Sequence, residues 1–431
     1  MGCTTSKDSP IIVGKSAHMG SQDLKRARSI YATKLKGLNG NNGEEKPQVD
    51  EKGHLMPEEV QKRIVGSTEV QTTIVGTDDS ELTQIQYAYL TQRGYYPDNI
   101  GQPNQDDYSI TLKLGGEAND AMFAVYDGHG SNGHDCAAFC KKDIPRSVAK
   151  YIRQKRSSRH IAKLKADGKS TKGAFRPELW STLEADEYSE CCCKAFKETN
   201  KALHENEKID DKLSGTTVAF VSFHRGRMSV CNLGDSRVLL GSSRSSSTED
   251  EGDTIQSIPL SMDQTPYRKD ERERVQAAGA EVKSIDQLHG KEEPHDNWGD
   301  VQGGEDDNPH KDPPRIWVKG NEFPGTAFTR SIGDTVAENI GVIDEPEMIA
   351  RELTDHDKYL VIATDGLFEF LKNSQVMEIV GKSSDPVDAC EKLRKASYEQ
   401  WLQHEDRVDD ITIIVCFLSK AKMPANESLG I

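Results

Sequence analysis

The sequence lacks long apolar runs. Only 35% of its 431 residues are hydrophobic, and no segment approaches the roughly 20 consecutive apolar residues of a membrane-spanning helix. No apolar stretch of the secretory-signal type lies near the start. The length suffices for one large or two ordinary domains, but the low apolar content indicates that part of the chain does not pack into a core. We therefore expect a protein that is not secreted and has no membrane-spanning helix.

Positive charge is also scarce. The 55 Lys and Arg residues and 71 Asp and Glu residues give a formal net charge of −16, which argues against nucleic acid as the main partner. The nine cysteines form neither a CxxC pair nor the spacing of a disulfide scaffold, so a reduced, intracellular compartment is expected. His134, Cys136 and Cys140 could suggest zinc, but no fourth ligand is in view, and helix packing is the simpler interpretation.

The composition changes along the chain. Residues 1–82 are poor in apolar residues and rich in Gly, Asn, Lys and Glu, which predicts a flexible tether. Packed structure is expected over residues 83–420, followed by a tail at 421–431. Within that domain, the basic residues 150–172 and the acidic residues 291–314 are predicted to be solvated insertions.

Apolar periodicity predicts more strands than helices. The predicted strands lie at residues 85–89, 121–127, 216–223, 227–233, 236–241, 358–366 and 409–418. The predicted helices lie at residues 187–205, 269–279 and 385–405. Because strands and helices do not alternate strictly, the expected fold class is α+β, an antiparallel, sandwich-like core covered by helices.

Acidic residues stand at the ends of several predicted strands. They are Asp106, Asp127, Asp235, Asp365 and Asp409, some with a second acid beside them. One strand-end aspartate is usually a turn residue, but a converging set would repel unless protons or cations intervened. Mg²⁺ or Mn²⁺ suits such oxygen ligands, and two ions about 4 Å apart can hold a hydroxide for in-line attack on phosphorus.

Two other motifs are misleading in their context. Gly128, Gly130 and Gly133 spell the G-x-G-x-x-G of a dinucleotide loop, but Asp127 would sit beside the pyrophosphate, and the segment about 20 residues on is basic and not strand-like. Cys231 and Arg237 satisfy the C-x5-R pattern of cysteine-dependent phosphatases. In that loop an intervening aspartate would repel phosphate, and a strand rather than a helix follows.

Six motifs in one order resemble the PPM-type, metal-dependent serine/threonine protein phosphatases, the protein phosphatase 2C family. The resemblance covers about residues 83–418 and is closest to the phosphatase part of plant proteins that also carry cyclic-nucleotide-binding and kinase domains. It implies two packed antiparallel sheets flanked by helices, a metal cleft at one end, and phosphorylated proteins as substrates. The motifs are YDGHGSNG, SGTTVAFV, NLGDSRVLL, FTRSIGD, IATDGLFEF and DDITIIV.

The resemblance also implies a set of metal ligands. Asp127 would bridge two core ions, Mg²⁺ or Mn²⁺, and the carbonyl of Gly128 would ligate one of them. Asp365 and Asp409 would hold the other ion. Asp235, together with Asp365, would form a weaker third site.

Further roles follow from the same resemblance. His129 would be the general acid that protonates the leaving Ser/Thr oxygen, Arg330 would be structural, and the role of Asp334 stays open.

The chain departs from the family pattern at two places. Gln105 replaces a common glutamate, which leaves a contribution to the second metal to Asp106. No arginine stands at residues 101–103, where the family has a phosphate-clamping one, so Arg93 is the nearest candidate. These departures keep an alternative open, a catalytically weak or dead binding module with the phosphatase fold.

The first residues carry a lipidation signal. Gly2 and Ser6 fit the M-G-x-x-x-[ST] pattern of N-myristoylation, and Cys3 is a natural palmitoylation site. The sequence therefore predicts a monomer held by acyl chains at the cytoplasmic side of a membrane.

Overall fold

The computed structural model describes residues 47–76, 82–171, 183–224, 227–244, 254–299 and 312–421. Gly2, Cys3 and the predicted tail beyond Ala421 lie outside these residues. In the part of the chain that is described, no helix is both long and apolar enough to span a bilayer.

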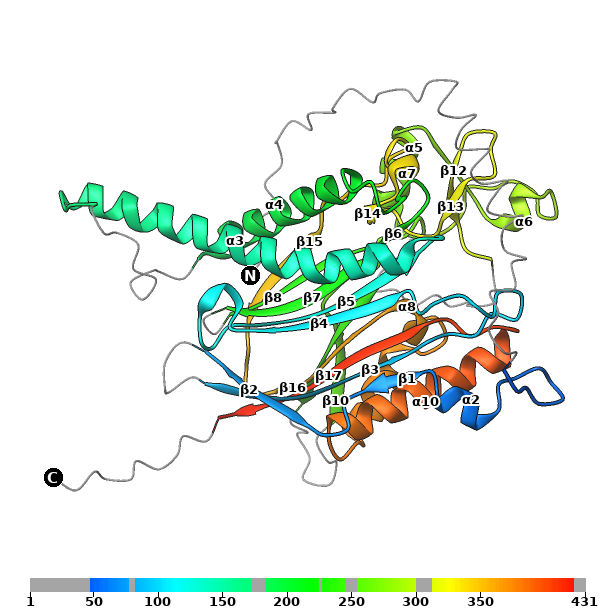
Figure 1. The fold of residues 1–431 in the computed structure, drawn as a ribbon, viewed down its shortest axis with the longest axis horizontal. Helices are drawn as coiled ribbons and strands as arrows, with labels where there is room; N and C mark the ends of the chain where they lie inside the picture. The colour runs from blue at the N-terminus through cyan, green and yellow to red at the C-terminus, as the bar shows by residue number, and fades with distance from the viewer. Residues whose placement is uncertain are drawn as a thin grey trace.

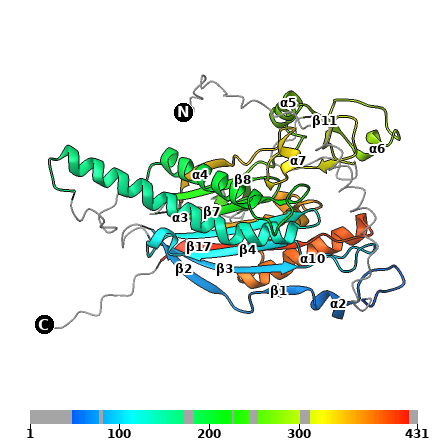
Figure 2. The same ribbon diagram turned by 45° about the horizontal axis from the view of Figure 1, so that its top comes forward.

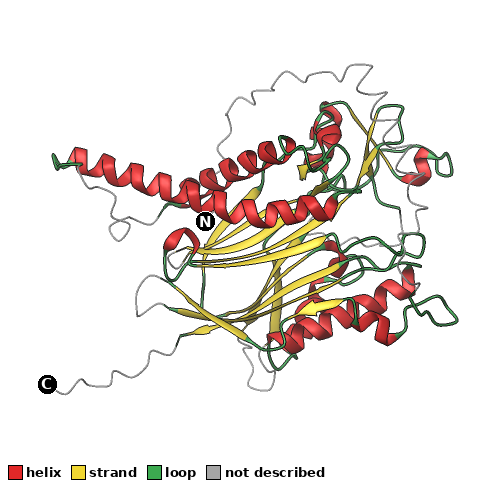
Figure 3. Cartoon of the chain, viewed as in Figure 1, coloured by secondary structure: helices red, strands yellow, loops and turns green. Residues whose placement is uncertain are grey.

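Two seven-stranded antiparallel sheets form the centre of the molecule (Figures 1 and 3). The first runs β1-β3-β17-β16-β9-β10, with β2 also paired to β3, and the second runs β14-β6-β5-β7-β8-β15, with β4 paired to β5. The first contains β1 (Ile64–Gly66), β2 (Gln71–Val75), β3 (Thr83–Gln92), β9 (Arg237–Arg244), β10 (Thr254–Pro259), β16 (Asp357–Ala363) and β17 (Ile411–Lys420). The second contains β4 (Asp106–Leu112), β5 (Ala121–His129), β6 (Gly215–Thr216), β7 (Val218–His224), β8 (Arg227–Leu233), β14 (Ile332–Gly333) and β15 (Glu347–Glu352).

Helices cover the outer faces of both sheets (Figure 3). The second sheet is covered by α3 (Gly133–Ala166) and α4 (Ala185–His204), and the first by α9 (Asn373–Gly381) and α10 (Pro386–His404). A cluster that includes Phe123, Val221 and Ile414 fills the space between the sheets. This layering confirms the predicted α+β sandwich.

A small subdomain stands at one end of the sandwich in both ribbon views (Figures 1 and 2). Its core includes Val275, Ile316 and Phe323. It consists of α5 (Lys269–Ala277), β11 (Ala280–Lys283), α6 (Ile285–Leu288), β12 (Arg315–Val318), β13 (Pro324–Thr326) and α7 (Thr335–Glu338).

The predicted start of packed structure at residue 83 is wrong. A short helix, α2 (Pro57–Gln61), precedes β1, and β1 pairs with β3 so that Ile64 lies opposite Gln92. β2 extends the same sheet along the other half of β3. The polar composition concealed these strands because both pack at the sheet's edge, where much of the strand faces solvent. Residues 1–46 of the predicted tether lie outside the described residues.

The basic insertion is a helix and not a solvated loop. Residues 150–166 continue α3, whose end extends beyond the sheets (Figure 2). Its charges have partners: Lys155 lies 2.6 Å from Glu190 of α4. Arg156 is buried and donates to Glu117 at 2.9 Å. These two positive charges therefore attach the helix to its neighbours.

The acidic insertion is only partly described, since residues 300–311 lie outside the structure. Trp298, inside the predicted solvated loop, is buried in the core of the subdomain. In α3, Cys136 and Cys140 are buried among apolar residues, which confirms helix packing over a zinc site.

Candidate metal centre

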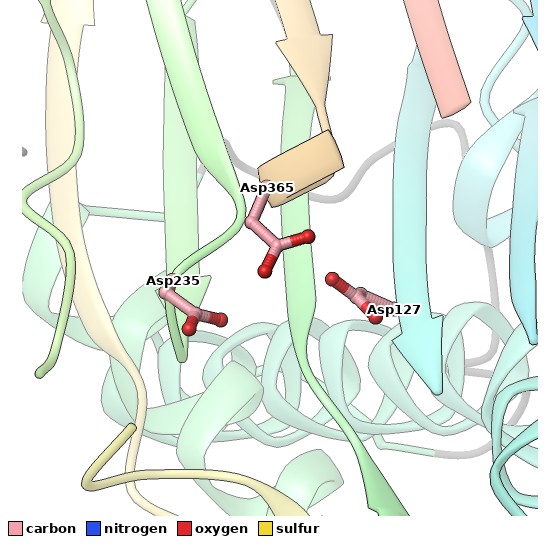
Figure 4. A group of neighbouring side chains, drawn as sticks. All are labelled: Asp127, Asp235 and Asp365. Carbon is pink, nitrogen blue, oxygen red and sulfur yellow. The ribbon is translucent and has the colours of Figure 1, made fainter. Parts of the chain in front are cut away.

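Three strand-end aspartates converge at one end of the sandwich. Asp127 lies near the end of β5, Asp235 in the turn between β8 and β9, and Asp365 follows β16 at the start of α8 (Asp365–Phe368). One carboxylate oxygen from each lies within 4.8 Å of the others, and Figure 4 shows the side chains pointing toward a common space. The sequence pattern thus predicted a true convergence.

This carboxylate group is electrostatically unfavourable by itself. Burial raises the pKa of Asp127 well above its usual range, and repulsion from Asp365 raises it further. Burial and repulsion from Asp409 likewise raise the pKa of Asp365. Burial, with Asp263 nearby, raises the pKa of Asp235 to about 6. Divalent cations would offset this repulsion, so the oxygen-only donor set fits Mg²⁺ or Mn²⁺.

The other two predicted carboxylate ligands flank this group. Asp409 lines the same cavity, and the hydroxyl of Tyr96 donates to its Oδ1. Asp106 lies opposite Asp127 in the β4–β5 pair, is buried, and accepts a hydrogen bond of 2.7 Å from Thr364. The negative charges of Asp106 and Asp409 both raise the pKa of Asp127. A direct role of either residue as a ligand stays a prediction.

Glycine is required at residue 128 by the close approach of other backbone segments. A Cβ there would lie 2.3 Å from the carbonyl oxygen of Gly133 and 2.6 Å from that of Gln105. Gly130 has a φ of +79°, in the region that favours glycine. These glycines permit the tight turn that the sequence predicted and line the cavity, while ligation of a metal by the Gly128 carbonyl stays a prediction.

His129 is held by Asp334 on the wall of the same cavity. Its Nε2 lies 2.6 Å from Oδ2 of Asp334, which also accepts a 2.6 Å bond from Ser331, and its ring packs against Phe328. Asp334 is buried, with a φ of +56°. Through these contacts Asp334 orients the histidine, and its role toward a metal stays open. The cavity that contains both residues and the carboxylates has a volume of about 700 Å³.

Comparison with known proteins agrees with this architecture. Residues 102–405 match the family model of protein phosphatase 2C. The chain belongs to the protein phosphatase 2C family. It is 40% identical over 337 residues to Probable protein phosphatase 2C 35 of Arabidopsis thaliana, covering 78% of this chain and 84% of the relative.

A more distant family member and a solved structure extend the comparison. Probable protein phosphatase 2C 48 of Oryza sativa subsp. japonica is 26% identical over 316 residues, covering 73% of this chain and 80% of the relative. The crystal structure of serine-threonine phosphatase 2C from Toxoplasma gondii matches with a TM-score of 0.56 at 16% identity, covering 82% of this chain and 100% of that one. The latter supports the phosphatase 2C fold. The likeness to plant fusion proteins stays a prediction.

The prediction that Arg93 clamps phosphate in this phosphatase 2C chain is not supported. Its Nε donates to the carbonyl of Gln102 and its Nη2 to that of Ile100, each at 2.7 Å. It is not among the residues that line the cavity. Arg93 therefore holds the loop before β4, and its positive charge acts on Asp410 from outside the cavity lining.

Gln105 supports the same loop with an interaction that a carboxylate could not make. Its Nε2 donates to the carbonyl of Gly130 at 2.6 Å, and its Oε1 accepts from Gln102 at 3.1 Å. An ionised glutamate has no donor for Gly130. The glutamine is thus accounted for by structure, which removes one argument for an inactive protein.

The remaining predictions concern residues outside the metal centre. Arg330 is structural as expected: its Nη2 lies 2.7 Å from Glu271. Arg268, Arg274 and Arg330 neutralise a second acidic group, Asp270, Glu271 and Glu347, as ion pairs.

The cysteine-phosphatase motif is excluded by burial. Cys231 lies within β8 in the core under α3 and α4, and burial raises the pKa of its thiol well above the usual range. Arg237 pairs with Asp263 at 2.7 Å. A buried, protonated thiol is neither a nucleophile nor accessible to substrate.

Proposed function

We propose that this phosphatase hydrolyses phosphoserine and phosphothreonine in proteins with the help of Mg²⁺ or Mn²⁺. Two core ions would be held by Asp127, the Gly128 carbonyl, Asp365 and Asp409, and a weaker third by Asp235 with Asp365. The observation that carries the proposal is the convergence of three carboxylates within 4.8 Å. When bound, the cations would supply Lewis-acid polarisation of the phosphoryl oxygens.

The chain's own residues contribute proton transfer and orientation. A serine or threonine alkoxide is a poor leaving group, so its departure requires a proton. His129 shares the cavity with the carboxylates and is the group assigned to deliver that proton. Asp334 keeps the imidazole in one orientation through the 2.6 Å contact. A phosphoryl group would therefore lie between His129 and the carboxylates, which line the same cavity.

The decisive experiment combines activity and stability of Asp365→Asn. With Mn²⁺ and a phosphothreonine peptide, wild type should be active and EDTA should abolish that activity. Asp365→Asn should lower kcat/KM by about 10³-fold, because several kcal/mol of charge stabilisation depend on the ions. In EDTA at neutral pH it should unfold at a higher temperature than wild type, because one source of repulsion is gone.

Asp107→Asn is the matched control. Asp107 belongs to β4, pairs with Lys141 at 2.6 Å and does not line the cavity, so this variant should keep full activity. A wild-type protein whose activity survives EDTA but is lost on thiol alkylation would overturn the proposal.

We further propose that acylation of Gly2 and Cys3 holds the phosphatase at a membrane surface. The support is the sequence motif alone, since both residues lie outside the described structure. Peripheral attachment by acyl chains requires no spanning helix.

A further inference from the structure

The proposed function requires a cation that recognises the substrate phosphate, and the following inference rests on that function. Arg93 is engaged elsewhere. Apart from His129, the basic residues that line the cavity are Arg237, Arg315, Lys372 and Arg407.

Three of these four residues are poorly suited to the task. Arg237 is held by Asp263 and Asn373, and its guanidinium stacks 4.5 Å from the ring of Phe368. Lys372 and Arg407 are exposed to solvent, where a single charge contributes little because water screens it.

Arg315 differs because it is half-buried and has unused hydrogen-bonding capacity. It opens β12 in the small subdomain, and its Nη1 donates to the carbonyl of Gly325 at 3.1 Å. Its Nε is buried and has no hydrogen-bond partner among the described residues. An unmade hydrogen bond at a buried charged donor is costly, which indicates a missing acceptor.

Arg315 shares the cavity with the converging carboxylates, and the negative charges around it favour its charged form. Burial lowers the pKa of its guanidinium, whereas the negative charges of Asp312, Glu369 and Asp235 oppose that effect. Arginine stays protonated at neutral pH in any case. Asp235 belongs to the converging carboxylates, so the positive charge acts on the metal centre from the subdomain side.

We propose that Arg315 binds the phosphate of the substrate, in place of an arginine before β4. Its planar guanidinium presents parallel N–H donors that match two phosphate oxygens, which an ammonium group cannot do. The cation comes from the subdomain and not from the sandwich, so the position of β12 relative to the sheets controls phosphate affinity.

The test measures phosphate binding separately from turnover. Calorimetry with inorganic phosphate and steady-state kinetics with a phosphothreonine peptide are carried out on the Mn²⁺-supplied protein. Arg315→Gln should weaken phosphate binding and raise KM by about 10- to 100-fold, the scale of a charge-assisted hydrogen bond, with a smaller change in kcat. The phosphate affinity and KM of Arg315→Lys should lie between those of wild type and those of Arg315→Gln. Lys319→Gln removes an exposed positive charge just beyond the same strand and should change nothing.

Phosphate affinity in a folded Arg315→Gln protein equal to that of wild type would overturn the inference. If near-UV circular dichroism shows that this variant has lost its fold, Arg315→Lys decides: weaker phosphate binding supports the proposal, and unchanged binding refutes it. A wild type that binds phosphate but cleaves no phosphopeptide would refute the proposed function instead, so the two failures are distinguishable.

Discussion

His129 depends on a partner 205 residues away in the sequence. Oδ2 of Asp334 lies 2.6 Å from Nε2 of His129 and accepts a hydrogen bond from Ser331, and the backbone of Asp334 is in the left-handed region. Asp334 therefore fixes the direction in which the histidine can deliver a proton. Asp334 therefore has a positioning role, whereas His129 is assigned to deliver the proton, and the two roles can be distinguished by experiment.

Replacement of His129 should affect substrates according to their leaving group. His129→Gln should lower kcat for a phosphothreonine peptide by about 10²- to 10⁴-fold, because the alkoxide then departs without a proton. Turnover of p-nitrophenyl phosphate, whose leaving group needs no proton, should fall much less. Asp334→Asn should shift the same ratio in the same direction by a smaller factor. Equal losses on both substrates would contradict the general-acid assignment.

Single residues divide into those that local sequence predicts and those that it does not. Asp127, Asp235 and Asp365 each stand at or just after the end of an apolar strand, so the strand pattern predicted that they converge. Arg315 and Gln105 carry no such local signal. Their roles depend on the carbonyls of Gly325 and Gly130, which only the folded chain brings near.

At the scale of elements, periodicity predicted the long central strands and three helices, and it missed the short strands and the remaining helices. The predicted elements are β3, β5, β7, β8, β9, β16, β17, α4, α5 and α10. α10 begins at Pro386, one residue after the predicted start, with Asp385 as its N-cap. α3 is 34 residues long, and ion pairs stabilise its second half, for which composition alone indicated a loop. Tertiary partners overrode the local tendency.

The end of α4 is attached to its neighbours by a protonated histidine. Hydrogen bonds to Asp211 and then to Glu338 raise the pKa of His204 to about 10 from an unfolded value of 6.5. Its contribution to stability is therefore complete below about pH 6.5 and lost as pH rises to about 10.

Urea unfolding of His204→Gln at several pH values tests this attachment. The variant should be less stable than wild type at pH 6, and the difference should shrink toward pH 10. His356, whose side chain is exposed, offers the control: His356→Gln should show no such trend. A difference for His204→Gln that is constant between pH 6 and pH 10 would exclude the ionic attachment.

At the scale of the whole molecule, the proposed anchor and the catalytic centre are independent. Gly2→Ala should release the protein from membranes. Cys3→Ser should leave it exchanging weakly, because one myristoyl chain gives only marginal binding. Catalysis in solution should be unchanged in both variants.

Fractionation of cells that contain active N-myristoyltransferase measures the membrane-bound share of each variant. Thr4→Ala changes a variable position of the motif and is the control that should stay bound. A wild type found only in the soluble fraction would contradict the anchor.

The position of β17 has a consequence for biosynthesis. This strand is the last regular element of the described chain, yet it lies between β3 and β16 and pairs with β3 from Ile411 to Lys420. While the ribosome is still translating, the first sheet is divided into two parts with open edges. A premature stop codon just before residue 411 would therefore yield an aggregation-prone fragment that quality control must remove, although it would contain every predicted metal ligand.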